Sequence, residues 1–367
     1  MEELAALFQA LLIILFFGGL ALLAQWGRKN RGAEVSLIVS VLFASFLVAA
    51  LGAVVALVGI SNTVPSSEAS PGLIIGSGAI ILLAGIAGIC LCIPPIRRVA
   101  GRHSAIARQG EDTTGQDSLA GSTGRYSSSE DAGGWWWSDP PIFFALWAFL
   151  NIFAINAVFL LVFALEPEGA SSTLASAGRV SFFIVFFSQL PLAIVALCGV
   201  GIGVRRSFRE TLARLGYGPI TLPQLGIVAL FIVGALLISF AFDSLFASLQ
   251  PDLFEQVGEV SEGLFSPEGL SPVSVILFAL LIGIGAGLGE ETLFRGALQP
   301  RLGIILTSIL WAVIHVQYGP SVLLINIFVL SLALGFLRKR VNTTATFLVH
   351  ASYNFLTVLL AYFLGGY

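Results

Sequence analysis

The feature of this sequence that most limits its fold is a series of apolar runs, each about 20 residues long. A helix of that length crosses a hydrocarbon core roughly 30 Å thick and satisfies its own backbone hydrogen bonds inside the lipid. About ten such runs occur, near residues 4–26, 35–60, 73–95, 142–165, 181–204, 225–248, 273–292, 303–318, 320–337 and 345–365. Charged residues make up only 11% of the chain, whereas soluble domains carry about a quarter. The sequence therefore predicts an all-α, polytopic transmembrane helix bundle in an integral, multi-pass membrane protein.

The distribution of Lys and Arg predicts how the bundle is oriented. These residues cluster in alternate loops, at Arg28, Lys29 and Arg31, at Arg97, Arg98, Arg102, Arg108 and Arg125, at Arg205, Arg206, Arg209 and Arg214, at Arg295 and Arg301, and at Arg338, Lys339 and Arg340. Arg179 is the only Lys or Arg in the opposite loops, which include an acidic segment, residues 250–269. The positive-inside rule then places the basic loops in the cytosol and both termini outside, and we expect the cell (plasma) membrane. The net charge of −3 does not point to nucleic acid, so the partner predicted here is the lipid bilayer.

Composition divides the chain into three parts. Residues 1–95 are predicted to form an N-terminal three-helix membrane segment, and residues 142–367 a C-terminal membrane domain. The stretch between them, residues 96–141, is rich in Gly and Ser and too poor in apolar residues to pack. We therefore predict a flexible cytosolic linker there. Trp135, Trp136 and Trp137 lie near its end, just before a span, a position typical of an interfacial aromatic anchor.

The last third of the chain places ionisable residues where the pattern predicts lipid-embedded helix. The segment "GLGEETLFRGALQ", residues 287–299, contains Glu290, Glu291 and Arg295. Glu291 and Arg295 lie four residues apart with the acid first, which is the favourable order for an ion pair on a helix. Glu290 projects about 100° away around the helix and lacks a partner on it, so it is the candidate base that takes a proton from water. Taken alone, such a cluster is also typical of charged side chains that reach from a helix end to the membrane interface.

Two of the three histidines also lie in apolar runs of this region. His315 follows Trp311 by four residues and His350 precedes Asn354 by four, so each pair shares one helical face. A lone histidine in a membrane is more often an interhelical hydrogen-bond donor than a catalyst. Polar groups are expensive in lipid and normally face the bundle interior, so these residues and the two glutamates should converge there. We therefore predict a catalytic core in the C-terminal helices.

These motifs resemble the CPBP family, also called Abi, which comprises CAAX proteases and bacteriocin-processing enzymes. "GEETLFRGALQ" matches the E-E-x-x-x-R motif of the family, "WAVIH" its aromatic-x-x-x-H motif, and "HASYN" its H-x-x-x-N motif. Trp311 stands where phenylalanine is usual. The resemblance is strong over residues 272–360 and becomes weaker back to residue 181. Residues 1–140 lie outside it.

The resemblance implies a membrane-embedded, glutamate-dependent endopeptidase. The residues that it implies as catalytic are Glu290, Glu291, Arg295, His315, His350 and Asn354. In that mechanism Glu290 and His315 activate a water molecule. The second histidine and the asparagine stabilise the oxyanion, and the Glu291–Arg295 pair holds the motif helix. The implied substrate is a membrane-associated or prenylated, CAAX-like protein or peptide presented at the membrane.

The cofactor and the function each have an alternative. A glutamate and two histidines can bind zinc, but the H-E-x-x-H helix of zinc proteases is absent, so we expect no metal and keep zinc as the alternative. Glu, Arg and His inside a membrane are also relay residues of transporters and proton channels, although we find no internal repeat. A non-catalytic family member acting in bacteriocin immunity is the third hypothesis, but it has no physical need for the complete motif set.

Overall fold

The computed structural model describes residues 2–61, 70–93, 139–166, 169, 181–265 and 270–364. In chain order its helices are α1 (Glu2–Ile13), η1 (Ile14–Gly18), α2 (Gly19–Gly27), α3 (Arg31–Ser61), α4 (Pro71–Leu91), α6 (Pro140–Leu165), α8 (Phe182–Gly199), α9 (Phe208–Arg214), α10 (Leu222–Leu249), α11 (Pro251–Phe265), α12 (Pro272–Glu290), η4 (Glu291–Leu298), α13 (Gln299–Val313), η5 (Val316–Tyr318), α14 (Val322–Arg340) and α15 (Thr343–Leu364). Every regular element in these ranges is helical, which confirms the predicted all-α class. Most of the predicted linker, with its three tryptophans, lies outside the described residues.

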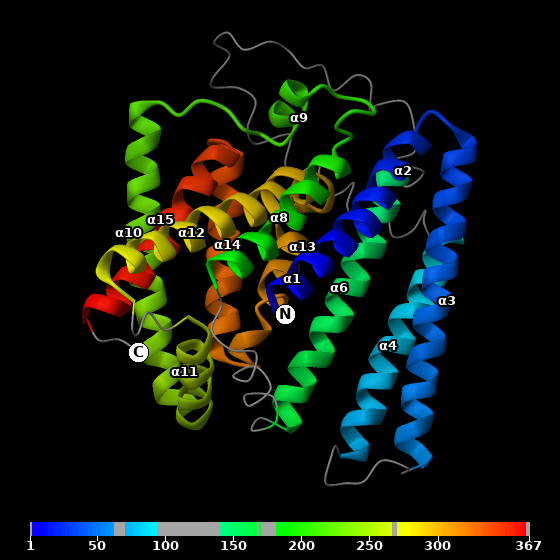
Figure 1. Ribbon diagram of the computed structural model, residues 1–367, viewed down its shortest axis with the longest axis horizontal. Helices are drawn as coiled ribbons and strands as arrows, with labels where there is room; N and C mark the ends of the chain where they lie inside the picture. The colour runs from blue at the N-terminus through cyan, green and yellow to red at the C-terminus, as the bar shows by residue number, and fades with distance from the viewer. Residues whose placement is uncertain are drawn as a thin grey trace.

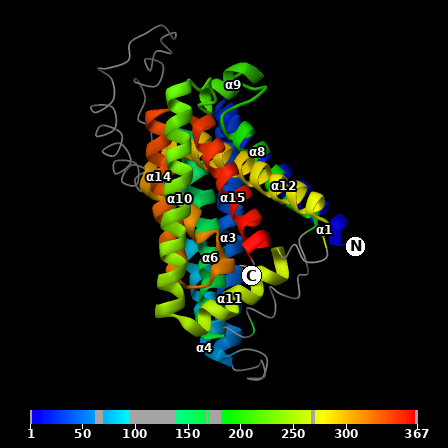
Figure 2. The same cartoon turned by 90° about the vertical axis from the view of Figure 1, so that its left-hand side faces the viewer.

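The helices form a bundle with two directions. Helices α3, α4, α6, α10 and α14 run roughly parallel or antiparallel to one another, whereas α1, α8 and α12 cross them obliquely (Figures 1 and 2). Helix α12 contacts both α8 and α15, and α13 contacts α14. The segments that carry the three motifs therefore meet inside the C-terminal part of the bundle.

Eight helices in the described ranges are long and apolar enough to cross a membrane, fewer than the ten predicted runs. The fifth run forms α8, whose apolar part Phe183–Gly199 is shorter than a span. The seventh and eighth runs join into one helical stretch, Pro272–Val313. The chain stays helical between them, with Pro300 at the start of α13. Gly303, with φ 80°, then breaks the helical geometry inside α13.

Small residues bring the N-terminal helices α3 and α4 into close contact. A Cβ on Gly52 would lie 2.2 Å from the backbone nitrogen of Leu82, and one on Gly78 would lie 2.4 Å from that of Ala56. Lipid supplies no hydrophobic driving force between helices, so close backbone approach at small residues is what stabilises such a pair. Helix α4 packs in turn on α6, which joins this hairpin to the rest of the bundle.

One carboxylate connects the ends of three helices. The Arg28 guanidinium, just after α2, donates two hydrogen bonds to Asp139, the residue before α6. Arg301 Nη1, in the first turns of α13, lies 3.4 Å from the same carboxylate. The N-terminal helices are thereby tied to the helix that leads to Trp311 and His315.

Four glycines of α12 form two stripes that hold this helix between its neighbours. They alternate along "GIGAGLGEE", at Gly283, Gly285, Gly287 and Gly289. The first and third face α15, where a Cβ on Gly283 would lie 2.4 Å from the carbonyl oxygen of Ala351. The second and fourth face α8, where a Cβ on Gly289 would lie 2.7 Å from the carbonyl oxygen of Gln189. The backbone of α12 is thus closely packed on both sides, directly before the glutamate pair.

The helix that carries the first motif changes from α-helical to π-helical geometry directly after α12. Residues Glu291–Leu298 form a π-helix, η4, where we predicted ordinary α-helix. Such segments are rare and frequently occur at functional sites. Glu290 ends α12 and Glu291 begins η4, so the two glutamates lie at the junction between the two geometries.

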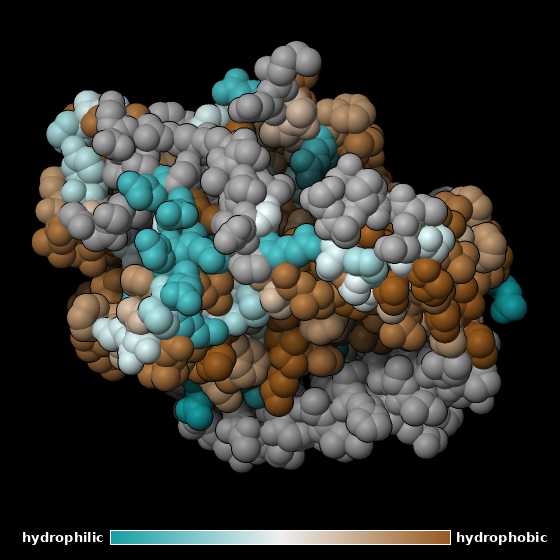
Figure 3. All heavy atoms as spheres, turned by 90° about the horizontal axis from the view of Figure 1, so that it is seen from below, coloured by the Kyte–Doolittle hydropathy of each residue, from teal (hydrophilic) through white to brown (hydrophobic). Residues whose placement is uncertain are grey.

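The acidic segment that we predicted as a loop contains the amphipathic helix α11. Its buried side includes Val257 and Val260, whereas its exposed side carries the carboxylates Asp252, Glu255, Glu259 and Glu262. Figure 3, a view from the α11 end, shows hydrophilic residues gathered over this region next to hydrophobic surface. The sequence analysis did not predict this helix because the segment is too polar for a membrane-spanning run. An amphipathic helix needs apolar residues on only one face.

Candidate active site

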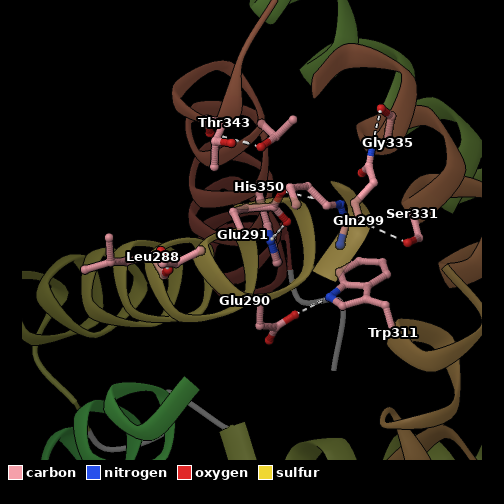
Figure 4. A network of polar contacts seen from close by, with 12 residues as sticks. Leu288, Glu290, Glu291, Gln299, Trp311, Ser331, Gly335, Thr343 and His350 are labelled. Carbon is pink, nitrogen blue, oxygen red and sulfur yellow. Dashed lines mark hydrogen bonds and ion pairs between the residues drawn. The ribbon is translucent and has the colours of Figure 1, made fainter. Parts of the chain in front are cut away.

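The Glu291 carboxylate connects two motifs. Its Oε2 lies 3.5 Å from Arg295 Nε, and its Oε1 lies 3.0 Å from His350 Nδ1 on α15. Glu291 is fully buried, and Arg295 is 1% exposed. Figure 4 shows Glu291 turned toward His350, with Glu290 turned away toward Trp311. The predicted ion pair between Glu291 and Arg295 is therefore present, and the contact with His350 adds a second partner.

Arg295 is enclosed by groups from two further helices. Its Nη2 donates to Ser331 Oγ on α14 at 3.1 Å, and its guanidinium carbon lies 4.8 Å from the ring centroid of Trp311. An arginine over an indole face gains cation–π attraction, which is stronger where water is absent. The charge of Arg295 is thus balanced by Glu291 and held in place by groups of α13 and α14.

Glu290 has a partner that sequence reasoning missed. The indole Nε1–H of Trp311 donates to Glu290 Oε2 at 2.5 Å, whereas Oε1 makes no hydrogen bond to any described residue. Glu290 lacks a partner on its own helix, as predicted, but the second motif supplies one from α13. The signal was available, since an indole differs from a phenyl ring by one hydrogen-bond donor.

The Trp311 ring also contacts both intramembrane histidines. Its ring centroid lies 4.9 Å from that of His315 and 5.5 Å from that of His350, with the rings edge to face in both pairs. Aromatic pairs favour this arrangement because the positive edge of one ring meets the negative face of the other. Trp311 is thus in contact with every predicted site residue except Glu291 and Asn354.

His315 lies just after α13, at the start of the turn into η5. Its Nδ1 lies 2.7 Å from the carbonyl oxygen of Trp311, which can only accept a hydrogen bond. Nδ1 therefore carries a proton, and the neutral ring has its lone pair on Nε2. The ring also stacks on Tyr318 of η5, with 6.2 Å between centroids.

Asn354 is the last of the predicted site residues along the chain. It lies one turn after His350 on α15 and is partly exposed. Its side chain makes no hydrogen bond with the residues that the structure describes. The neighbouring Tyr353 hydroxyl, by contrast, is 2.8 Å from Ser239 Oγ on α10.

The loop between α9 and α10, residues 215–221, is fixed against one end of the site. Thr343 Oγ1 donates to the carbonyl oxygen of Leu215 at 2.6 Å, and the Thr343 backbone N–H donates to that of Gly216 at 2.9 Å. Gly216 has φ 82°, a conformation that favours glycine. The Tyr217 hydroxyl lies 2.6 Å from Thr292 Oγ1 of η4.

This loop places a phenol close to the buried carboxylate. Burial raises the pKa of Tyr217, and the Glu291 carboxylate raises it further, whereas the hydrogen bond with Thr292 opposes both effects. Tyr217 therefore stays neutral at ordinary pH and acts as a hydrogen-bonding group. Its position outside the predicted spans is why sequence reasoning did not include it.

The described residues do not offer a compact set of metal ligands. No group of three or more His, Cys, Asp or Glu side chains among them gathers closely enough to hold a metal ion. His315 and His350 each place Nδ1 against a protein acceptor, and the Trp311 indole donates to one oxygen of Glu290.

One comparison with known proteins finds a match, and it covers the C-terminal helices. A family model described as "Type II CAAX prenyl endopeptidase Rce1-like" matches residues 272–356. The matched segment runs from α12 into α15 and includes all six predicted site residues, which confirms the resemblance drawn from the three motifs. No curated protein and no solved structure matches the chain.

Proposed function

We propose, because residues 272–356 match the Rce1-like family model, that this protein is a membrane-embedded endopeptidase using glutamate-activated water. One observation carries the proposal, namely that ionisable residues from all three motifs meet around a single indole in an otherwise apolar bundle. Ionisable residues inside a membrane are costly to maintain and mark functional sites by default.

The attacking water is assigned to Glu290 and His315. Trp311 occupies Oε2 of Glu290, so Oε1 remains to accept a hydrogen bond from water. Nε2 of His315 has the lone pair and offers a second acceptor. The water loses a proton to this pair as its oxygen attacks the scissile carbonyl carbon, and the leaving amine takes a proton when the C–N bond breaks.

The oxyanion is assigned to His350 and Asn354. Nδ1 of His350 is committed to Glu291, so only Nε2 can face the substrate, and it donates when the ring carries both protons. Asn354, one turn further, contributes its amide N–H groups. Donors aimed at developing charge in a water-poor site contribute strongly to catalysis. Glu291 and Arg295 act by holding His350 and the motif helix in place.

The proposed substrate is a peptide or protein presented at the membrane, of the prenylated, CAAX-like class that the family description names. The apolar surface of the bundle makes the lipid bilayer the second partner. We place the basic loops in the cytosol and both chain ends outside, in the plasma membrane, from the distribution of Lys and Arg. The proposed reaction uses no metal, because activation of the water is assigned to Glu290 and His315 alone.

The proposal can be tested by comparing protein termini in membrane fractions of cells that carry the wild type or Glu290→Gln. We expect a defined set of cleaved termini in the wild type that vanishes in the variant, because the amide cannot take a proton from water. Glu259→Gln is the matched control, since Glu259 is an exposed acid on α11, a helix that carries none of the three motifs. Identical protein termini in cells with the wild type and with Glu290→Gln, at equal protein levels, would contradict the proposal.

A further inference from the structure

Trp311 makes two separate contacts to the pair that is assigned to activate water. Its indole Nε1–H donates to Glu290 Oε2, and its backbone carbonyl accepts from His315 Nδ1. One residue therefore sets the orientation of a carboxylate on α12 and the tautomer of an imidazole after α13. The contact with Glu290 is buried and that with His315 is partly buried, and Trp311 itself is 5% exposed.

We propose that Trp311 is a positioning residue for the base, whose indole N–H fixes one oxygen of Glu290 and directs the other toward the attacking water. This inference rests on the proposed function. The carboxylate projects from the junction of α12 and η4, where no group of its own helix holds it. Without the N–H, Glu290 can rotate about its side-chain bonds, and the water loses its fixed acceptor.

The ring of Trp311 and its N–H have different tasks, which makes the two separable. The ring supports the edge contacts to His315 and His350 and the contact to the Arg295 guanidinium. A phenylalanine at this position retains an aromatic ring and the backbone carbonyl but has no donor. Trp311→Phe therefore removes the hydrogen bond to Glu290 and leaves the tautomer of His315 unchanged.

The chain contains a matched control for the loss of a buried indole donor. Trp147 on α6 is 3% exposed, and its Nε1–H donates to Ser45 Oγ on α3 at 2.9 Å, in the N-terminal part of the bundle. Trp147→Phe loses the same kind of group at a comparable depth, away from both glutamates. Any general effect of replacing a buried tryptophan will be seen in both variants.

The experiment measures kcat, KM and thermal unfolding of purified wild type, Trp311→Phe and Trp147→Phe on a cleaved peptide. We expect kcat of Trp311→Phe to fall about tenfold or more, as for a lost hydrogen bond to a charged group, with KM unchanged and stability close to that of Trp147→Phe. Wild-type kcat in Trp311→Phe would overturn the inference. If that variant unfolds, benzothienylalanine at position 311, which keeps the bicyclic shape without the N–H, must show the same loss of kcat.

A second measurement separates this inference from the proposed function. In ¹⁵N-indole NMR spectra, the signal that Trp311→Phe removes should shift in Glu290→Ala, because its acceptor is lost, and should not shift in Glu259→Gln. A signal unaffected by Glu290→Ala would refute the hydrogen bond whether or not the protein cleaves peptides. If the signal shifts in Glu290→Ala but the wild-type protein cleaves no peptide, the hydrogen bond is established. The proposed function, and with it the positioning role, is then contradicted.

Discussion

Glu291 shows what can and cannot be predicted for a single residue. Its pairing with Arg295 follows from a spacing of four along one helix, which sequence alone reveals. Its contact with His350 comes from α15, 59 residues later, and depends on how two helices pack. The Trp311 donor to Glu290 has the same origin, so the residues of the site were predictable and most of their partners were not.

The buried ion pair leads to a prediction about stability. Arg295→Ala should lower the free energy of unfolding by about 3–5 kcal/mol, because the buried Glu291 carboxylate loses its arginine partner and keeps only His350. Chemical or thermal unfolding in lipid nanodiscs measures the change. Arg209→Ala, which removes an exposed arginine of α9, should stay within about 0.5 kcal/mol of the wild type.

A double variant sharpens this test. Glu291→Gln combined with Arg295→Gln replaces both charges, so its loss of stability should be smaller than the sum of the two single changes. An Arg295→Ala protein as stable as the wild type would contradict the role of the pair in holding the motif helix.

At the scale of elements, apolar length predicted most spans but not their geometry. Runs of about 20 apolar residues must be helical in lipid because no other backbone partners exist there. The π-helix η4, the short α8 and the amphipathic α11 each depend on packing that apolar length does not encode. The structure differs from our expectation in these three elements and in the joining of the seventh and eighth runs into one helical stretch.

The glycine stripes of α12 yield a prediction at this scale. Gly283→Ala adds a methyl group where a Cβ would lie 2.4 Å from the Ala351 carbonyl oxygen, so α12 and α15 must move apart. We expect a loss of about 1–3 kcal/mol of stability and reduced turnover, because Glu290 ends α12 and His350 lies on α15. Unfolding and peptide cleavage, measured on the same preparation, report both effects.

The control for this change is a glycine with open space around it. A Cβ on Gly234 of α10 meets no atom within 4 Å, so Gly234→Ala should be neutral or stabilise the helix by up to about 1 kcal/mol. If Gly283→Ala behaves like Gly234→Ala in both measurements, close packing of α12 does not position the site.

For the whole molecule, the three motifs indicated a common interior site before any contact was known. The reason is physical, since six polar or ionisable groups on apolar helices have to share the bundle interior. The sequence did not indicate how the N-terminal helices attach to that core. Tertiary structure supplies this through the Asp139 carboxylate, which binds Arg28 and Arg301, and through the packing of α4 on α6.

The most direct test of the account is turnover of a cleaved peptide by purified protein, wild type and Glu290→Gln, after treatment with a chelator such as phenanthroline. We predict that the treated wild type retains its turnover, that the purified protein holds far less than one equivalent of metal, and that Glu290→Gln is inactive with unchanged thermal stability. Cleavage retained by Glu290→Gln would contradict the assignment of the base. Stoichiometric zinc that is lost together with activity, and restores it on re-addition, would contradict catalysis by glutamate-activated water without a metal.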